Sequence, residues 1–408
     1  MAENRLSGFP GGRFCIYFAR MENLHEKYSM CALNRIFGFE PQIAHALISH
    51  LGSAAEVFTL GENEINSLLG PYSKHKGKIC RKAYDDAVDE IELLSEKGIS
   101  FIGYTEEGYP ELLRECEDAP LGLYIRSRTP AQELFTPQRR IAVVGTRDIS
   151  PYGHEWCHRI VRHLGTSPER PAIVSGLALG TDICAHRQAL ESNLPTIAVM
   201  ATGPDAIYPY RNRETAERIA DTEGCALITD YPPGTAPLAI HFLRRNRIIA
   251  GLSDSTILIE SRIKGGGMMT ARLAFSYNRD VLALPGRIDD LRSQGCNLLI
   301  RNKTAEAIDS IEALTTSLGL QTSRSRKQDS MENILREKFP DADTSLISRL
   351  IHILDLIRKN RGINLDDLSA KSGMDYSIVA RLTGILEIEG LISMDLLQRC
   401  TINARIYR

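Results

Sequence analysis

The chain has 408 residues, of which 43% are hydrophobic and 25% charged, and this composition excludes collagen-like, fibrous and disordered proteins. Its formal net charge of −2 provides no overall attraction to nucleic acid, so a nucleic-acid partner would have to bind at a local basic patch. No apolar run approaches the ~20 residues that cross a bilayer and the start lacks a secretory core, so we expect a cytoplasmic protein with no membrane partner.

The N-terminal part of the sequence divides into a tail and a helical segment. Residues 1–28 show no sustained hydrophobic period and are rich in glycine, which predicts a loose tail. In residues 29–125 the apolar positions recur with the period of a helix, and a turn at Gly38 separates the first two helices. This pattern predicts an all-helical domain of the helix–hairpin–helix or sterile-alpha-motif-like type, which can hold a phosphate on backbone amides. A helical packing domain without a ligand is the alternative.

Residues 138–312 alternate apolar runs with helical stretches. The strand candidates begin at Ile141, Ala172, Thr196, Ala226, Thr256 and Val281. Each is a continuous apolar run, as in parallel strands that are buried on both faces. Because helical stretches of ~10–15 residues fill most of the gaps, we predict an α/β fold with a doubly wound parallel sheet.

The last part of the chain predicts a linker and a small domain. Residues 321–330 are polar, as in a linker. Residues 331–408 contain three amphipathic helical stretches followed by two short strand candidates, which is the order of a winged-helix domain. Its charges nearly balance, so DNA contact and protein interaction remain alternatives for this domain.

Three glycine-bearing loops follow predicted strands, where ligands of doubly wound sheets bind. None matches GxGxxG or the P-loop, so a dinucleotide or nucleoside-triphosphate site is poorly supported. Glycine lets the backbone approach an anion closely, and Pro151 as a first helical residue would aim free amides at the first loop. We therefore expect phosphate-binding turns, with an ordinary tight turn as the alternative for the first loop. The candidate residues are Gly145, Thr146, Arg147, Ser175, Gly176, Gly265, Gly266 and Gly267.

Two further segments combine cations with features of single-strand binding. In the segment from Tyr208 to Arg213, Tyr210 and Arg211 place an aromatic ring beside a guanidinium, which suits stacked bases and phosphates. Arg244, Arg245, Asn246 and Arg247 open an otherwise apolar helix, where cations oppose the macrodipole. A cluster placed against that gradient favours an anionic ligand, so we expect Arg245 to face DNA and Arg247 to face partly the loop framework.

Other possible metal or acid–base groups are few. Asp182 and His186 lie four residues apart on one helical face, but further ligands are missing, so a structural hydrogen bond is favoured. The nine cysteines form no CxxC pair, which is typical of buried thiols in a reducing compartment. We expect no metal and no cofactor.

The motifs together resemble those of the DNA-processing protein A (DprA, also called Smf) family. The matching strings are Val144-Gly145-Thr146-Arg147, Ser175-Gly176-Leu177-Ala178, Ile207-Tyr208-Pro209, Asp230-Tyr231-Pro232-Pro233-Gly234 and Arg245-Asn246-Arg247-Ile248-Ile249-Ala250-Gly251-Leu252-Ser253. The resemblance implies a Rossmann-like core and a non-enzymatic, dimeric protein. Such a protein binds single-stranded DNA, protects incoming strands in natural transformation and loads the RecA recombinase. The alternatives are a Rossmann-like nucleoside-monophosphate phosphoribohydrolase and a scaffold that binds only protein.

Overall fold

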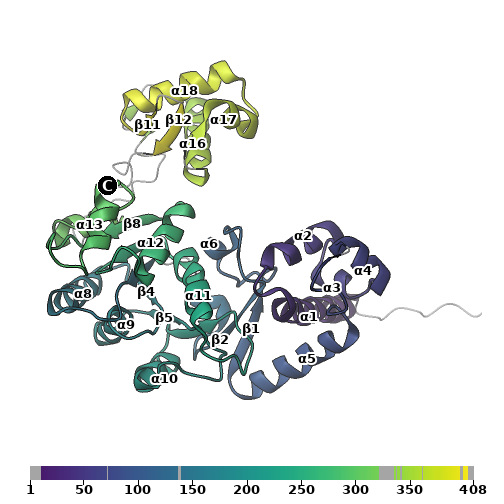
Figure 1. Cartoon of the computed structure of the whole chain (residues 1–408). Coiled ribbons are helices and arrows are strands. Elements are labelled where there is room, and N and C mark those ends of the chain that lie inside the picture. Colours follow the sequence, from purple (N-terminus) through teal and green to yellow (C-terminus); the bar gives the residue numbers. More distant parts are fainter. Residues whose placement is uncertain are drawn as a thin grey trace, which may run out of the picture.

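The computed structural model describes residues 11–70, 72–136, 139–320 and 335–402, except 337, 341, 361, 396 and 397. A helical N-terminal part, a large sheet covered by helices and a small C-terminal domain follow one another along the chain (Figure 1). Among the described residues, none of the helices is long and apolar enough to span a membrane.

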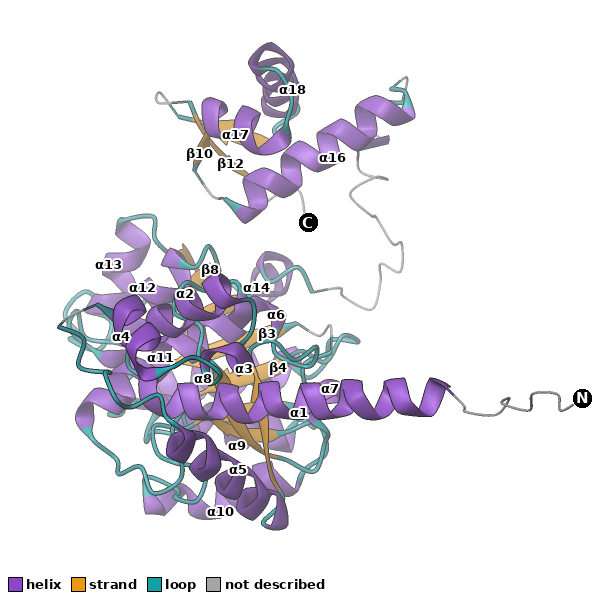
Figure 2. Ribbon diagram, turned by 90° about the vertical axis from the view of Figure 1, so that its right-hand side faces the viewer, coloured by secondary structure: helices purple, strands orange, loops and turns teal. Residues whose placement is uncertain are grey.

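The N-terminal part is built around one long helix. Its helices are α1 (Gly11–Phe37), α2 (Pro41–Leu51), α3 (Ala54–Val57), α4 (Glu62–Leu69) and α5 (Arg81–Glu96). Helix α1, which runs lengthwise in Figure 2, begins at Gly11. The prediction of a loose tail over 1–28 is therefore wrong from residue 11 on, and residues 1–10 lie outside the described part. Helix α2 ends at Gly52, whose φ of 99° is a left-handed conformation that favours glycine.

The predicted parallel strands are confirmed as the centre of a nine-stranded sheet with the order β1-β2-β6-β5-β4-β3-β7-β8-β9. These strands are β3 (Arg140–Val144), β4 (Ala172–Ser175), β5 (Thr196–Val199), β6 (Ala226–Thr229), β7 (Ser255–Leu258) and β8 (Asp280–Ala283), and β9 (Glu306–Ala307) follows at the edge. Strand β3 pairs in parallel with both β4 and β7, and the chain winds outward on either side of it. This reversal of strand order creates the crevice where ligands of such sheets bind.

Two antiparallel strands extend this sheet into the segment that was predicted to be helical. Strands β1 (Ile99–Gly103) and β2 (Gly122–Arg126) pair with each other, and β2 pairs with β6, so that Tyr124 lies opposite Thr229. One face of β2 places Tyr124 in the helical core, and the other places Leu123 in the sheet core. The prediction of an all-helical segment up to residue 125 is wrong here, because these strands are buried on both faces and join the two parts.

Helices cover both faces of the sheet, as predicted. Helices α8 (Pro151–Leu164) and α9 (Thr181–Glu191) pack with one hydrophobic cluster, and α11 (Ala239–Leu252) and α12 (Gly266–Ser276) pack with the other. The remaining elements of this part are α6 (Glu111–Arg114), α7 (Ala131–Leu134), η1 (Tyr210–Asn212), α10 (Arg213–Asp221), α13 (Gln294–Arg301) and α14 (Ile311–Ser317). The fold class is therefore the predicted α/β, Rossmann-like arrangement.

The C-terminal domain has a core of its own, which includes Leu350, Leu368 and Leu382. Helices α16 (Thr344–Lys359), α17 (Leu365–Ser372) and α18 (Tyr376–Ile388) pack with a three-stranded sheet of order β10-β12-β11. These strands are β10 (Ile363–Asn364), β11 (Ile392–Met394) and β12 (Arg399–Ile402). Three helices with this antiparallel ribbon form the winged-helix arrangement that the sequence predicts. The predicted linker 321–330 lies outside the described residues.

Candidate functional site

The glycine-bearing loops meet at the carboxyl edge of the sheet, but chiefly to pack on one another. A Cβ atom on Gly267 would lie 3.0 Å from Cα of Gly145, and one on Gly145 would strike the hydroxyl of Thr181. Thr146 accepts hydrogen bonds from the backbone amide and the hydroxyl of Thr181 through its carbonyl oxygen, at 3.1 and 3.2 Å. Gly145 and Gly267 therefore lack side chains so that the loop after β3 can pack closely against the starts of α9 and α12. Gly266 is exposed, and a Cβ there would meet nothing within 4 Å.

The start of helix α8 is already filled by a carboxylate of the protein. Ser150 caps this helix by accepting a hydrogen bond from the amide of Gly153 at 3.1 Å. Buried Glu260 accepts from the Ser150 amide at 2.9 Å and from its hydroxyl at 2.5 Å. The favourable place for an anion at this N-terminus is thus occupied. The predicted phosphate cradle at Pro151 is wrong, because Glu260 from the loop after β7 supplies the negative charge.

Ser175 and Gly176 also turn inward rather than toward a ligand. Ser175 is buried, and its hydroxyl donates to the Val143 carbonyl at 2.6 Å, which links neighbouring strands. The carbonyl of Gly176 accepts from the guanidinium of Arg245, and that guanidinium fills the space that a Cβ on Gly176 would need. Both residues are therefore structural in this arrangement, contrary to the expected anion contacts.

Arg245 lies inside the protein, so the expectation that it faces DNA is wrong. Its side chain is 3% exposed, and it donates hydrogen bonds to the carbonyl oxygens of Gly176 and Val199. Burial lowers the pKa of Arg245 to about 10, and the nearby Asp182 carboxylate partly opposes this effect. The guanidinium remains charged at neutral pH and ties together the ends of β4 and β5. Asn246, the next residue, is buried as well.

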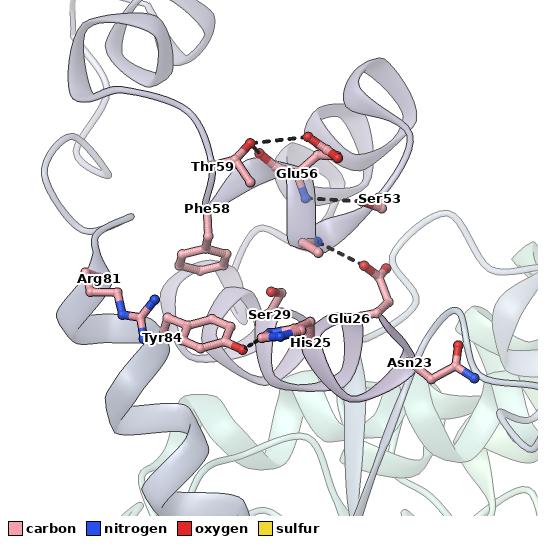
Figure 3. A pocket seen from close by; sticks show the side chains of 11 residues that line it. Asn23, His25, Glu26, Ser29, Ser53, Glu56, Phe58, Thr59, Arg81 and Tyr84 are labelled. Atoms are coloured by element: carbon pink, nitrogen blue, oxygen red, sulfur yellow. Dashed lines mark hydrogen bonds between the residues drawn. The ribbon is translucent and has the colours of Figure 1, made fainter. Parts of the chain in front are cut away.

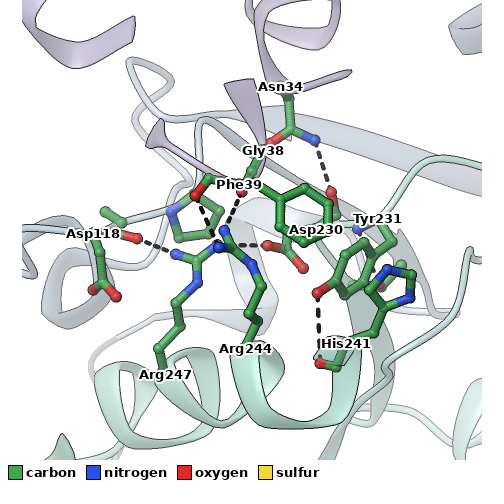
Figure 4. A network of polar contacts seen from close by, with 12 residues as sticks. Asn34, Gly38, Phe39, Asp118, Asp230, Tyr231, His241, Arg244 and Arg247 are labelled. Atoms are coloured by element: carbon green, nitrogen blue, oxygen red, sulfur yellow. Dashed lines mark hydrogen bonds and ion pairs between the residues drawn. The ribbon is translucent and has the colours of Figure 1, made fainter. Parts of the chain in front are cut away.

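Arg244 and Arg247 connect the sheet with the N-terminal part (Figure 4). Arg247 forms a buried ion pair of 2.6 Å with Asp230 and donates to the Asp118 carbonyl. Burial disfavours the charge of Arg247, but the carboxylates of Asp230 and Asp118 outweigh it and raise its pKa. Arg244 donates to the carbonyl oxygens of Gly38 and Phe39 at 2.7 and 2.8 Å. The signature arginines therefore hold parts of the protein together.

A set of exposed side chains, grouped around the half-buried ring of Phe242 and the exposed ring of Tyr210, lies at the carboxyl edge. The Arg147 guanidinium lies 4.9 Å from the centroid of the Phe242 ring. The rings of Tyr208 and Phe242 meet edge to face, with 5.5 Å between their centroids. Tyr210 is 74% exposed, and the guanidinium of Arg213 lies 5.7 Å from its ring. Arg211 is exposed beside it. We call the following residues the aromatic–arginine surface: Arg147, Tyr208, Tyr210, Arg211, Arg213 and Phe242.

The loop that carries Tyr210 is held in place from beneath. Buried Asn212 donates to the carbonyl of Leu177 at 2.8 Å. Leu177 has a φ of 60°, a left-handed conformation that is costly for a side chain of this size. The hydrogen bond from Asn212 thus joins the loop after β5 to the loop after β4, and it does so at Leu177, whose backbone is strained.

Arg147, Tyr210 and Arg211 are the predicted site residues with exposed side chains on this surface. Tyr208 and Arg213 are the two ends of the segment whose rings and cations predict single-strand binding. Phe242 was missed as a site residue. The sequence feature that could have identified Phe242 is its position shortly before the arginine run. It lies three residues before Arg245, so the two side chains lie on neighbouring parts of the helix surface.

Asp182 and His186 serve the interior. His186 is fully buried, and its Nδ1 lies 2.7 Å from the Thr196 hydroxyl. Burial, and secondarily the charge of Arg245, lowers the pKa of His186 to about 3. Asp182 accepts from the Ala178 amide at 3.3 Å, and burial raises its pKa. His186 is therefore neutral at physiological pH, which fits the structural role that was favoured over acid–base chemistry.

A separate pocket lies in the N-terminal part, between α1, α3 and α5 (Figure 3). It has a volume of about 570 Å³. Its polar groups bind one another: His25 lies 2.6 Å from the Tyr84 hydroxyl, and Glu26 accepts from the amides of Ala54 and Ala55. The Glu26 carboxylate occupies the start of α3, so this pocket offers less to a phosphate than the aromatic–arginine surface does.

Known proteins resemble this chain in its sheet-bearing part, and some of them over most of its length. The family model described as DNA recombination-mediator protein A matches residues 100–319. A putative DNA processing protein DprA of Mycobacterium tuberculosis is 30% identical over 368 residues, which cover 86% of this chain and 89% of that protein. Protein Smf of Synechocystis is 40% identical over 229 residues, or 56% of each chain.

The structural comparison agrees with this match. The crystal structure of DNA processing protein A from Streptococcus pneumoniae superposes on this chain with a TM-score of 0.54 and 28% sequence identity. The aligned residues make up 72% of this chain and 95% of the Streptococcus pneumoniae chain. The chain spans about half the length of the Synechocystis and Escherichia coli relatives, at 56% and 50%.

Proposed function

The chain belongs to the DNA recombination-mediator protein A family, and from this premise we propose that it binds single-stranded DNA on the aromatic–arginine surface. The observation that carries the proposal is that exposed guanidiniums lie against aromatic rings, Arg147 against half-buried Phe242 and Arg213 against exposed Tyr210. Bases stack on such rings whatever their sequence, and the cations neutralise the phosphates. Duplex DNA hides the faces of its bases, so this surface favours single strands.

The position of the surface supports the same proposal. It lies at the carboxyl edge of the parallel strands, where the order of the strands reverses beside β3. The loops that form it are held rigidly by Asn212 and by the Arg245 guanidinium beneath. Exposed Gly266 at the start of α12, a helix with no acidic residue in its first turn, adds backbone amides for a phosphate.

The wider role proposed for the chain is DNA processing in natural transformation and recombination. It would protect incoming single strands, act as a homodimer and deliver the strands to a RecA-type recombinase. Support for this role comes from membership of the family and from the matching motifs, whereas the geometry of the site supports the DNA contact alone. We propose that binding, and not catalysis, is the task of the sheet edge.

Titration of the full chain with labelled oligonucleotides tests the proposed function. Single-stranded and duplex forms of several sequences are compared at a series of salt concentrations. We expect tighter binding of single strands with little sequence bias, and a steep loss of affinity with salt as phosphate contacts release counterions. Equal affinity for both forms, or affinity that is insensitive to salt, would contradict the proposal. Release of free base from AMP by the same preparation would favour the phosphoribohydrolase alternative.

A further inference from the structure

Helix α8 carries two histidines one turn apart. His154 and His158 belong to the run His154-Glu155-Trp156-Cys157-His158, which has the H-E-x-x-H spacing of helices that bind zinc. Residues four apart share one helix face, and the centroids of these two rings lie 4.6 Å apart at an interplanar angle of 37°. The helix itself therefore presents a pair of imidazoles, independently of the aromatic–arginine surface.

A third possible ligand comes from the neighbouring helix α9. One ligand atom each of His154, His158 and Cys184 lies within 4.8 Å of the others. In a tetrahedral zinc site, bonds of ~2.0–2.1 Å to nitrogen and ~2.3 Å to sulfur place two nitrogens roughly 3.3 Å apart and a nitrogen and a sulfur roughly 3.6 Å apart. His154 is exposed and His158 half-buried, so rotation of these rings can close the difference while Cys184 stays buried.

Cys184 lies where α9 meets α8. Its side chain is buried, and its Sγ lies 3.9 Å from the backbone carbonyl oxygen of His154. The other buried thiol nearby, Cys157 of α8, lies 3.9 Å from the Thr181 carbonyl oxygen instead. Packing of the two helices therefore holds the Cys184 sulfur beside the histidine pair, and a bound ion would take the place of its proton.

We propose that His154, His158 and Cys184 bind one zinc-class divalent ion, which clamps α8 to α9. Two imidazoles and one thiolate form a ligand set that zinc and cobalt prefer, and exposed His154 leaves the fourth position open to water. Glu155 forms an ion pair of 3.5 Å with Arg159, so the proposal covers ion binding and no hydrolytic reaction. The sequence-based expectation of no metal considered the missing CxxC pair and not the spacing of His154 and His158, and the third ligand, Cys184, comes from a different helix.

Cobalt substitution provides the test. The full chain, prepared without a histidine tag and stripped with a chelator, is titrated with Co²⁺ alone and then with Zn²⁺. We expect one equivalent of Co²⁺ per chain, visible bands of a tetrahedral complex and near-ultraviolet charge transfer from the thiolate. Zn²⁺ should displace the spectrum. His158→Gln and Cys184→Ala should each weaken binding at least about tenfold, since loss of a ligand exceeds the usual effect of an outer-shell change.

Two controls separate this site from unspecific binding. His50 on α2 and Cys80 before α5 are exposed, so His50→Gln and Cys80→Ser remove the same side-chain types elsewhere and should leave the titration unchanged. His154→Gln alters an exposed side chain and should lose the ion without loss of fold, as circular dichroism would show. A Co²⁺ complex without thiolate charge transfer, or affinity that survives in His154→Gln and Cys184→Ala, would overturn the proposal.

Discussion

Two arginine-bearing regions of this molecule were both expected to contact DNA, but their arginines lie in opposite environments. In α11, Arg245 and Arg247 are 3% and 6% exposed and bind carbonyl oxygens and a carboxylate of the protein. At the loop after β3, Arg147 is exposed and rests on the Phe242 ring. The expectation that these arginines open a helix against its dipole is wrong, because α11 begins at Ala239 and the arginines lie in its middle turns. A cluster of cations in an apolar helix thus indicates an anionic or carbonyl partner without telling whether that partner is a ligand. In α11 the partner is the protein itself.

We therefore expect the buried arginines of α11 to control stability, and the proposed aromatic–arginine surface to control affinity for DNA. Each of the following changes tests that division. Changes in the buried region should have the larger effects, because loss of a buried charged contact costs more stability than loss of an exposed one.

The largest effect is expected from Arg247→Met. This change leaves the buried Asp230 carboxylate without its partner, which typically costs about 3–5 kcal/mol in free energy of unfolding. Urea unfolding of the full chain measures the loss. As a control, Asp230→Leu combined with Arg247→Met removes both charges and should be more stable than Arg247→Met alone. If the single variant were as stable as the wild type, the ion pair would not hold this region together.

Arg245→Ala comes next. It removes hydrogen bonds to Gly176 and Val199 and leaves two buried carbonyl oxygens unpaired, so we expect about 2–3 kcal/mol of lost stability. Under conditions where the variant is folded, its affinity for single-stranded DNA should stay close to that of the wild type. Normal stability with a large loss of affinity would instead return Arg245 to the DNA surface.

Acidification should weaken the buried region by a similar amount. His186 has a pKa of about 3 when folded and about 6.5 when unfolded, so below pH 6.5 the unfolded chain takes up the proton first. Stability should therefore fall from pH 6.5 downward, by about 2 kcal/mol at pH 5. Asp182, whose pKa is raised by burial, acts in the opposite direction.

The histidine share of this pH dependence can be isolated with His186→Asn, which keeps a donor toward Thr196 and does not titrate. Unfolding is measured from pH 8 to pH 5 for both proteins. The slope below pH 6.5 should be reduced in the variant. Identical slopes would show that other groups cause the acid sensitivity.

On the aromatic–arginine surface, Arg147→Ala should reduce affinity for single-stranded DNA and leave the free energy of unfolding nearly unchanged. A hydrogen bond to a charged group contributes about 1.5–3 kcal/mol, which corresponds to tenfold or more in the dissociation constant for single-stranded DNA. Surface changes typically alter stability by no more than about 0.5 kcal/mol. Arg301→Ala removes an exposed arginine from α13, which contributes nothing to the aromatic–arginine surface, and should bind normally. Equal affinities of the two variants would exclude Arg147 from the interface.

The smallest effect is expected at Tyr210. Its ring is 74% exposed, so Tyr210→Ala should weaken single-strand binding about fivefold, at the low end of the range for stacking. Tyr210→Phe keeps the ring and should bind as the wild type does. If both variants were equally weak, the hydroxyl and not the stacked ring would be the contact, and the stacking part of the proposal would fail.

Much of the fold could be predicted because its signals are local. The parallel strands are continuous apolar runs, and the helices between them repeat their apolar positions every turn. Strands β1 and β2 were missed because they lie within a segment whose apolar positions repeat with the period of a helix; at five residues each they are no shorter than the strands that were found. Their place in the sheet depends on pairing with β6, about 100 residues later in the chain.

The candidate site shows the same limit. The loops around Gly145 and Tyr210 were found because ligands of parallel sheets bind at the carboxyl edge, and because rings beside cations indicate single-strand contacts. Filling of the α8 N-terminus by Glu260 was not foreseen, because Ser150 and Glu260 are 110 positions apart. No local pattern distinguishes an amide that awaits a ligand from one that a distant carboxylate satisfies.

The α/β class, the order of the central strands along the chain, the winged-helix domain and the family could be inferred from the sequence, because they follow from periodicity and from strings of neighbouring residues. Which polar side chains are buried depends on the tertiary structure: Arg245 is buried beneath Gly176 and Arg247 against Asp230, whereas Arg147 lies exposed on Phe242. The physical reason is that burial of a charge is tolerated only where hydrogen bonds and opposite charges compensate it, and here those partners come from other elements brought close by folding.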